Sequence, residues 1–335
     1  MVVSGVQQLA VRAAEAGLRI DKWFKRRYPD LTHGRLQKLA RSGQIRLDGK
    51  RVKSGDRVEE GQIVRVPPLG DAQTFRAKPP PAPRRKEVSD ADADMIQSAV
   101  IYQDASAIAI DKPPGLATQG GTGTTRHVDG MLDALAEDGE RPRLVHRLDR
   151  DTSGVLLLAR TQKSAAKLTA SFRDRSAKKL YWALVAGVPD PARGKVDLAL
   201  KKAGSRGNER MVWDDPDGDR AITFYATLEK AGKAASFVGL LPQTGRTHQL
   251  RAHMAAIGHP ILGDGKYGGE DARLPGMGLP KGMMLHARAL DIPHPTERGR
   301  LRIYADVPVA FQEALTTFGF VPGEAGDQLL DEDFR

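Results

Sequence analysis

The spacing of apolar residues divides the chain into a small region with short helices and a larger region dominated by strands. In the small region, apolar positions recur at helical spacing, and Asp48-Gly49 between two short runs is typical of a β-hairpin turn. The elements predicted there are helices over 20–28 and 33–41 and strands over 45–47, 50–52 and 63–66. We expect them to form one compact unit over residues 17–67.

After residue 98 the pattern changes to short apolar runs separated by Gly, Pro and Asp, which is typical of strands. The run 155–159 is apolar at every position and predicts a buried strand. The other predicted strands lie at 100–102, 107–110, 180–185, 196–200, 222–227, 237–241 and 301–305, and the predicted helices at 164–173 and 247–257. Strands and helices do not alternate regularly, so the predicted class is α+β, with a mixed, largely antiparallel β-sheet flanked by helices.

Two segments lie outside these folded regions. Residues 68–97 are rich in proline, including Pro79 to Pro81, and predict an extended, semi-rigid linker. Residues 323–335 are acidic and predict a tail that frays. The larger region is therefore expected to span residues 98–322.

The composition of the 335 residues indicates a cellular compartment. Cysteine is absent, which removes disulfides and thiolate nucleophiles and suits a reducing cytoplasm. The first residues lack a basic segment followed by an apolar one, so no secretory signal is predicted. No apolar run approaches the ~20 residues that span a bilayer. We therefore expect a cytoplasmic protein without a membrane partner.

The net charge of +10 is concentrated in the small region, where residues 12–65 contain fifteen Lys or Arg against seven Asp or Glu. A basic unit joined to a nearly neutral body suggests a handle for a polyanion, which would attract phosphates without reading sequence. The alternative is a solvated helix face, on which Lys25 and Arg27 are also expected to be exposed. The residues that we expect to contact nucleic acid are Lys22, Arg26, Arg35, Lys38, Arg41, Lys50 and Arg51.

The strongest candidate for chemistry is the segment from Val145 to Arg160, VHRLDRDTSGVLLLAR. It holds the carboxylate of Asp149 in a basic loop before the buried strand, a position suited to an acid–base group or a nucleophile. The alternative is a loop carboxylate that only forms salt bridges. His146, in the same loop, is expected to be a structural hydrogen-bonding residue.

Other chemistries fit the sequence less well. The histidines after residue 247 do not have the H-E-x-x-H spacing of a metal site. The tripeptide Thr152-Ser153-Gly154 lacks the G-x-S-x-G elbow of a serine hydrolase. The glycines at 120–123 are not followed by Gly-Lys-Ser or Gly-Lys-Thr, so a phosphate-binding loop is not predicted.

The segment VHRLDRDTSGVLLLAR closely resembles the signature loop of the RNA pseudouridine synthases of the RluA superfamily, H-R-L-D-x-x-T-S-G. Further matching segments follow in chain order, KKLY at 178–181, GRTHQLR at 245–251, GHPILGD at 258–264 and LHA at 285–287. The basic small region resembles the S4-like RNA-binding domain. The roles that the resemblance implies are a catalytic carboxylate for Asp149, pairing with that carboxylate for Arg246, enclosure of the target base for Tyr181 and Leu285, and filling of the gap left by the flipped nucleotide for Arg147.

The resemblance implies an isomerase that converts specific uridines to pseudouridine, without a metal or a cofactor. Within the superfamily, the chain resembles the RluC-type synthases of bacterial large-subunit (23S) ribosomal RNA. Two alternatives stay open, an RluD-like synthase that acts on other 23S uridines and a non-catalytic RNA-binding ribosome-assembly factor. The expected partner is 23S ribosomal RNA or a pre-ribosomal particle, and the simplest expectation for the protein itself is a monomer.

Overall fold

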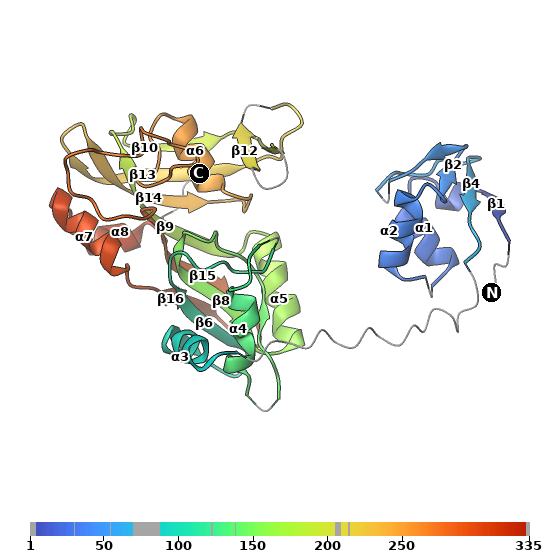
Figure 1. Ribbon diagram of the computed structural model, residues 1–335, viewed down its shortest axis with the longest axis horizontal. Coiled ribbons are helices and arrows are strands. Elements are labelled where there is room, and N and C mark those ends of the chain that lie inside the picture. The colour runs from blue at the N-terminus through green and yellow to red at the C-terminus, as the bar shows by residue number, and fades with distance from the viewer. Residues whose placement is uncertain are drawn as a thin grey trace. The chain divides into compact units, whose positions relative to one another are not determined.

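The computed structural model describes residues 5–29, 31–53, 55–69, 88–121, 123–137, 139–204, 209–213 and 215–332 (Figure 1). The chain forms two compact units, Met1–Arg85 and Lys86–Arg335. Each unit has hydrophobic clusters of its own.

The first unit packs two short helices against a small antiparallel sheet with the strand order β1-β4-β2-β3. Its elements are β1 (Gln7–Ala10), the 3-10 helix η1 (Ala13–Glu15), α1 (Ile20–Arg27), α2 (His33–Arg41), β2 (Arg46–Leu47), β3 (Lys50–Arg51) and β4 (Ile63–Val66). Both predicted helices are confirmed, and they bury Trp23, Phe24 and Leu36 in a common core.

The predicted hairpin is also confirmed, because β2 pairs with β3 across Asp48 and Gly49. Both turn residues have a positive φ, 48° and 77°, as the two-residue turn that suits the twist of a hairpin requires. The sheet gains one unpredicted strand, β1, which pairs with β4 and lies before the expected start of the unit at residue 17. The polar residues of β1 carry no strand pattern, so this strand depends on its partner rather than on its own sequence.

Arg27 differs from the expectation that it is exposed. Its guanidinium donates hydrogen bonds of 3.0 and 2.7 Å to the Glu15 carboxylate and lies 4.5 Å from the centre of the Trp23 ring. The hydrogen bond from Arg27 is the main reason that the pKa of Glu15 falls to about 2. This arginine therefore stabilises the fold of the first unit instead of extending into solvent.

The second unit is built on one ten-stranded sheet with the order β10-β13-β14-β9-β15-β8-β6-β5, to which β16 adds beside β15 and β7 beside β8. The pairings are antiparallel except for the parallel pair of β8 and β15, so the predicted mixed, largely antiparallel sheet is confirmed. The strands are β5 (Val100–Gln103), β6 (Ala107–Lys112), β7 (Arg143–Leu144), β8 (Ser153–Ala159), β9 (Lys178–Ala186), β10 (Arg193–Asp197), β13 (Ile222–Ala231), β14 (Ala235–Pro242), β15 (Leu285–Pro293) and β16 (Arg300–Tyr304).

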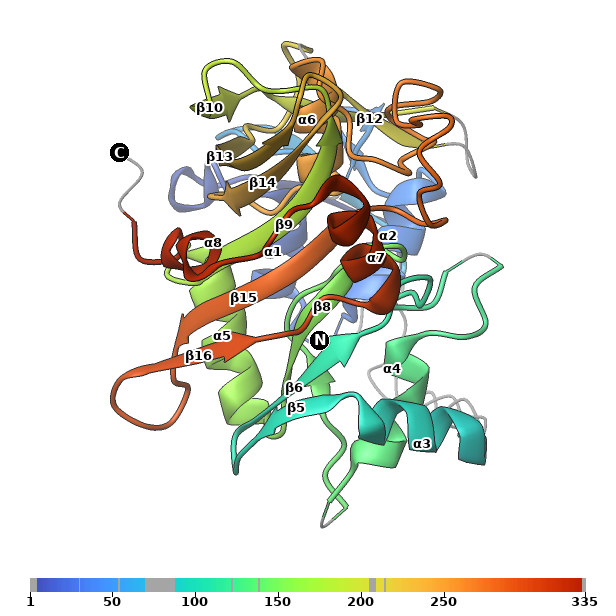
Figure 2. The ribbon, with the colours of Figure 1, turned by 90° about the vertical axis from the view of Figure 1, so that its left-hand side faces the viewer.

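Helices cover both faces of this sheet, and a separate hairpin lies beside it. The hairpin consists of β11 (Leu200–Ala203) and β12 (Arg210–Trp213). The helices are α3 (Asp90–Ser98), α4 (Val128–Met131), the 3-10 helix η3 (Leu132–Leu135), α5 (Gln162–Arg173), α6 (Gln249–Ala256), α7 (Val309–Phe318) and α8 (Glu324–Gln328). Figure 2 shows α7 in front of the sheet and α5 behind it.

The predicted buried strand is confirmed as β8, which is buried at every position. Leu156 and Leu158 belong to the cluster that α3 and α4 cover, whereas Val155 and Leu157 pack with Leu168 of α5. A strand covered on both faces has no polar positions, which explains why the sequence shows an unbroken apolar run there.

Gly154 allows β8 and β15 to approach each other at the point where the Asp149 loop enters the sheet. Its φ is 105°, and a Cβ atom at this position would lie 2.2 Å from the carbonyl oxygen of Ala287. Only glycine fits such a contact. The glycine of the H-R-L-D-x-x-T-S-G pattern thus fixes the junction from which the loop emerges.

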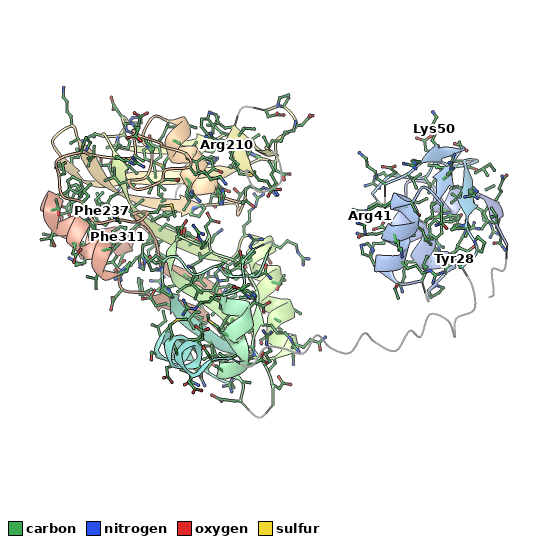
Figure 3. All side chains as sticks on the ribbon, viewed as in Figure 1. Tyr28, Arg41, Lys50, Arg210, Phe237 and Phe311 are labelled. Carbon is green, nitrogen blue, oxygen red and sulfur yellow. The ribbon has the colours of Figure 1, made fainter. Side chains whose placement is uncertain are left out.

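The predicted linker extends too far toward the second unit, and the predicted fraying tail begins too early in the chain. Residues 70–87 of the linker lie outside the described residues, but Asp90–Ser98 forms α3, which begins at the N-cap Ser89 and buries Ile96 in the second unit. The tail does not fray from residue 323, because α8 forms there and Leu329 and Leu330 are fully buried. They join a core cluster with Phe237 and Phe311, which are labelled in Figure 3.

Candidate active site

A cleft of about 730 Å³ opens beside α6 in the second unit. It is lined by the loop between β7 and β8, the turn between α5 and β9, and the turn between β14 and α6. Every residue that the resemblance assigned to the active site lines this one cleft, although these residues are spread over more than a hundred positions of the sequence. They are Arg147, Asp149, Tyr181, Arg246 and Leu285.

The loop that carries Asp149 is held by hydrogen bonds to its backbone on both sides of that residue. Thr118 Oγ1 accepts from the Leu148 N–H at 3.1 Å and donates to the Leu148 carbonyl at 2.7 Å. On the other side, the fully buried Lys112 donates to the carbonyl of Arg150 at 3.0 Å. The carboxylate itself is 23% exposed, so it is accessible from the cleft on a fixed backbone.

Lys112 is unusual because a buried ammonium has no carboxylate partner within 4.0 Å among the described residues. Its Nζ instead donates to three carbonyl oxygens, those of Pro113, Leu116 and Arg150, at 2.8 to 3.0 Å. Burial lowers the pKa of Lys112 to about 8. The sequence Asp-Lys-Pro-Pro-Gly gives no sign of this role, since it depends on where the loop after Leu148 returns.

His146 is a structural hydrogen-bonding residue, as predicted. Its Nε2 accepts from the Leu157 N–H at 2.8 Å, and its ring stacks on Phe172 at a centroid distance of 4.4 Å. Burial lowers the pKa of His146 to about 3, so the imidazole is neutral at physiological pH. It therefore anchors the loop to β8 and α5.

Tyr181 and Leu285 come together through the pairing of β9 with β15. Leu285 is registered with Ala183, which lies two residues from Tyr181 on the same face of β9. Both side chains belong to the apolar cluster beside α6, and Leu285 is only 2% exposed. Burial, followed by the nearby Asp149, raises the pKa of Tyr181, so its phenol stays protonated. The pair thus adds an aromatic and an apolar surface to the lining of the cleft.

The prediction that Arg246 pairs with Asp149 is wrong. Its Nη1 lies 3.5 Å from Asp219 Oδ2, and its Nε donates to the carbonyl of Arg220 at 3.2 Å. The guanidinium next to Asp149 belongs to Arg251, whose Nη1 lies 3.8 Å from Asp149 Oδ2. The difference follows from the start of α6 at Gln249, because Arg246 lies in the turn before the helix and Arg251 lies in its first turn.

Arg251 is fixed by a bidentate pair with Asp264. Its Nε and Nη2 donate to the two Asp264 oxygens at 2.7 and 2.8 Å. The two side chains are 8% and 1% exposed, so the pair is buried. Both residues stand in the segments quoted for the resemblance, but their spacing in sequence does not show that they meet.

His248 is the second polar neighbour of Asp149 that the sequence did not reveal. Its Nε2 lies 3.9 Å from Asp149 Oδ2, and its Nδ1 lies 2.9 Å from the hydroxyl of Tyr267. That hydroxyl already accepts from the Met211 N–H at 2.9 Å, so its own proton is free to be donated to Nδ1. Burial lowers the pKa of His248. The arrangement fits a neutral imidazole whose Nε2–H faces the Asp149 carboxylate.

The predicted RNA-contacting side chains of the first unit are exposed. Lys22 and Arg26 lie on α1, Arg41 lies at the end of α2, and Lys50 lies on β3; Figure 3 labels Arg41 and Lys50. The remaining members of the set, all exposed as well, are Arg35, Lys38 and Arg51. Arg147, in the second unit, is exposed at the cleft.

No group of three or more His, Asp or Glu side chains is arranged to hold a metal ion in the described part of the chain. His253 and His259 instead lie within hydrogen-bond distance of the carbonyl oxygens of Leu198 and Ala186. No helix over these residues is long and apolar enough to cross a membrane.

Comparisons with known protein families agree with this arrangement. The model of the RNA pseudouridylate synthase family matches residues 106–256, and that of the S4 domain matches residues 18–64. The first match contains the Asp149 loop, Tyr181 and the first helical turn of α6.

Individual proteins resemble the chain over most of its length. The ribosomal large subunit pseudouridine synthase C of Vibrio cholerae is 33% identical over 315 residues, which cover 93% of this chain and 96% of that protein. The protein of the same name from Rickettsia bellii is 35% identical and covers 88% of this chain and 95% of its own. Among solved structures, human RNA pseudouridylate synthase domain containing 4 has a TM-score of 0.58 and 29% identity, covering 68% of this chain and 95% of that one.

Proposed function

The chain belongs to the RNA pseudouridylate synthase family and carries an S4 domain, and from that membership we propose that it isomerises uridines of large-subunit ribosomal RNA. The similarity to the named synthases extends over both units, which supports a shared class of substrate. Those relatives are named synthase C, which favours this specificity over the RluD-like alternative.

The reaction breaks the bond between ribose C1′ and uracil N1 and forms a bond between C1′ and C5. The proton on C5 leaves and N1 gains one, so the product is an isomer and no other reactant is required. The protein must supply a carboxylate next to the ribose, a wall that holds the detached base, and groups that keep the carboxylate charged and oriented.

We assign the carboxylate to Asp149, and the position of this residue in the cleft is the structural observation that supports the proposal. Its backbone is fixed on both sides, and its Oδ2 faces Arg251 and His248 at 3.8 and 3.9 Å. The cation of Arg251 and the imidazole of His248 therefore both lie next to the oxygen that would act on the ribose. Attack on C1′ and removal of a ribose proton would both use this same group.

We assign the wall for the base to Tyr181 and Leu285. An unstacked base is held by aromatic and apolar surfaces in enzymes that flip nucleotides. The phenol of Tyr181 stays protonated because burial raises its pKa, so it presents a neutral surface to the uracil. Arg147, exposed at the mouth of the same cleft, is suited to occupy the place of the flipped nucleotide.

The proposal is tested by mapping pseudouridine in ribosomal RNA from cells that lack the gene, with carbodiimide treatment and primer extension. We expect specific large-subunit sites to be lost, and to return with the wild-type gene but not with Asp149→Asn. The variant protein should bind RNA within a few fold of wild type, because the carboxylate acts on the ribose and contributes little to affinity.

Either of two results would count against these assignments. An unchanged map would direct attention to transfer RNA or to a non-catalytic role in ribosome assembly. Residual isomerisation by Asp149→Asn would remove Asp149 from the catalytic role while leaving the substrate assignment in place.

A further inference from the structure

One end of the cleft carries three cationic side chains from a single short segment. Arg173 ends α5, Arg175 lies in the following turn, and Lys179 is the second residue of β9. All three line the cleft that contains Asp149. Neither the family resemblance nor the proposed chemistry assigns a role to any of the three.

These three cations have no carboxylate partner within 4.0 Å among the residues that the structure describes. The nearest acidic residue in sequence, Asp174, accepts a hydrogen bond of 3.0 Å from the Ser176 N–H. It does not line the cleft. The described residues that do line it include one carboxylate, Asp149, and six cations, Arg147, Arg173, Arg175, Lys179, Arg246 and Arg251.

Lys179 lies on the same face of its strand as Tyr181. Side chains alternate along a strand, so residues two apart point to one face and stand about 7 Å from each other. Lys179 Nζ donates to the carbonyl of Thr244 at 3.3 Å, and an ammonium has three donors. Two donors are therefore left for a ligand located one nucleotide away from the base that Tyr181 would hold.

Arg175 adopts a backbone conformation that is unfavourable for its residue type. Its φ is 67°, in the left-handed region, where a residue with a Cβ atom is disfavoured. The turn that results allows the chain to leave α5 and enter β9 within a few residues while Arg173 and Arg175 both line the cleft. A glycine would form this turn without strain, whereas the arginine in its place adds a cation to the lining of the cleft.

We propose that Arg173, Arg175 and Lys179 form a phosphodiester-binding subsite for the RNA backbone next to the target uridine. This inference rests on the proposed function and deepens it, because it names the part of the second unit that holds the strand. Cations without carboxylate partners match a ligand that carries one negative charge per nucleotide. A subsite one nucleotide from Tyr181 would fix the register of the strand while the uridine is turned out.

The test compares two double variants that remove the same charge from the same segment of chain. Arg173→Gln with Arg175→Gln removes two cations of the subsite. Lys163→Gln with Lys167→Gln removes two exposed cations of α5 that do not line the cleft. Both are made in the Asp149→Asn background, and binding to transcribed 23S ribosomal RNA and to oligouridylate is measured at several salt concentrations.

We expect the subsite variant to bind about tenfold more weakly at physiological salt. The slope of log affinity against log salt should fall by roughly 0.7–0.9 for each lost contact, while the control variant keeps the slope of its parent. In the active background, the loss should fall mainly in KM, since a phosphate contact is made before and during the reaction. Thermal unfolding of both variants shows that the comparison is between folded proteins.

Equal weakening by the two variants, or an unchanged salt slope in both, would overturn the subsite. These outcomes differ from a failure of the proposed function. If wild-type protein forms no pseudouridine in ribosomal RNA, the binding comparison with oligouridylate still decides whether the α5–β9 turn holds an RNA backbone.

Discussion

Two sets of cations in the second unit differ in their partners. Beside the C-terminal segment, Arg288 and Arg302 are each bound to carboxylates, those of Asp327, Asp331 and Asp291, at 2.6 to 2.9 Å. At the cleft, the described residues provide no carboxylate within 4.0 Å of the subsite formed by Arg173, Arg175 and Lys179. The first set joins β15 and β16 to α8 and the residues after it, whereas the second set is left available to a ligand.

A count of basic residues therefore does not predict which cations are available to RNA. Arg27 in the first unit and Arg288 in the second are both half-buried, each paired with a carboxylate and each over a Trp ring, at 4.5 and 4.6 Å. Their loss should affect the free energy of unfolding. The loss of an unpaired cation at the cleft should affect RNA affinity instead.

The largest effect is expected for Arg251, which is paired and also faces Asp149. Arg251→Met leaves the buried Asp264 carboxylate without its bidentate partner, at a cost of about 3–5 kcal/mol in the free energy of unfolding. Activity should fall as well, because the cation beside Asp149 is removed. Calorimetry of the full chain follows the transition of the second unit.

The matched control is Arg251→Met combined with Asp264→Asn, which removes the uncompensated charge and should regain part of the stability but not the activity. Recovery of both would mean that Arg251 acts only on the fold.

A smaller effect is expected for Arg288. This arginine is paired with a carboxylate, but neither it nor any residue that it contacts lines the cleft. Arg288→Gln removes a bidentate pair with Asp327 and the contact with Trp182, and should cost about 2 kcal/mol in the free energy of unfolding. RNA affinity and its dependence on salt should be those of wild type. A loss of affinity comparable to that of the subsite variant would contradict the separation between paired and unpaired cations.

Local sequence patterns predicted most of the fold. Helical spacing identified α1, α2, α5 and α6, and an apolar run identified β8. The missed elements include β1, β15 and α7, whose residues pair or pack with partners distant in sequence. The end of the chain was misjudged for the same reason, because acidic residues suggested a solvated tail while Leu329 and Leu330 pack into the core.

The resemblance predicted which residues line the cleft but not how their charges pair. Asp149, Tyr181 and Leu285 meet there as expected, whereas Arg246 binds Asp219 and Arg251 takes the position beside Asp149. The motif GRTHQLR contains both arginines, and only the helical turn that begins at Gln249 distinguishes them. Pairing with Asp264 and the contact between His248 and Tyr267 depend on tertiary structure, which a linear motif does not encode.

The smallest effect separates Lys179 from the arginines of its subsite by pH. Burial, followed by the nearby Arg175, lowers the pKa of Lys179 to about 8. A phosphate favours the charged amine, so binding is linked to proton uptake, and affinity should fall as pH rises through this value. Between pH 7 and 8.5 the RNA affinity should decrease by up to about fourfold, since the protonated fraction of Lys179 in the free protein falls by that amount.

Two single variants provide the controls. Lys179→Arg keeps the charge at every pH in this range and should remove the dependence, whereas Lys178→Arg, on the opposite face of β9, should retain it. If all three proteins show the same pH profile, the titrating group lies elsewhere and Lys179 does not contact the RNA.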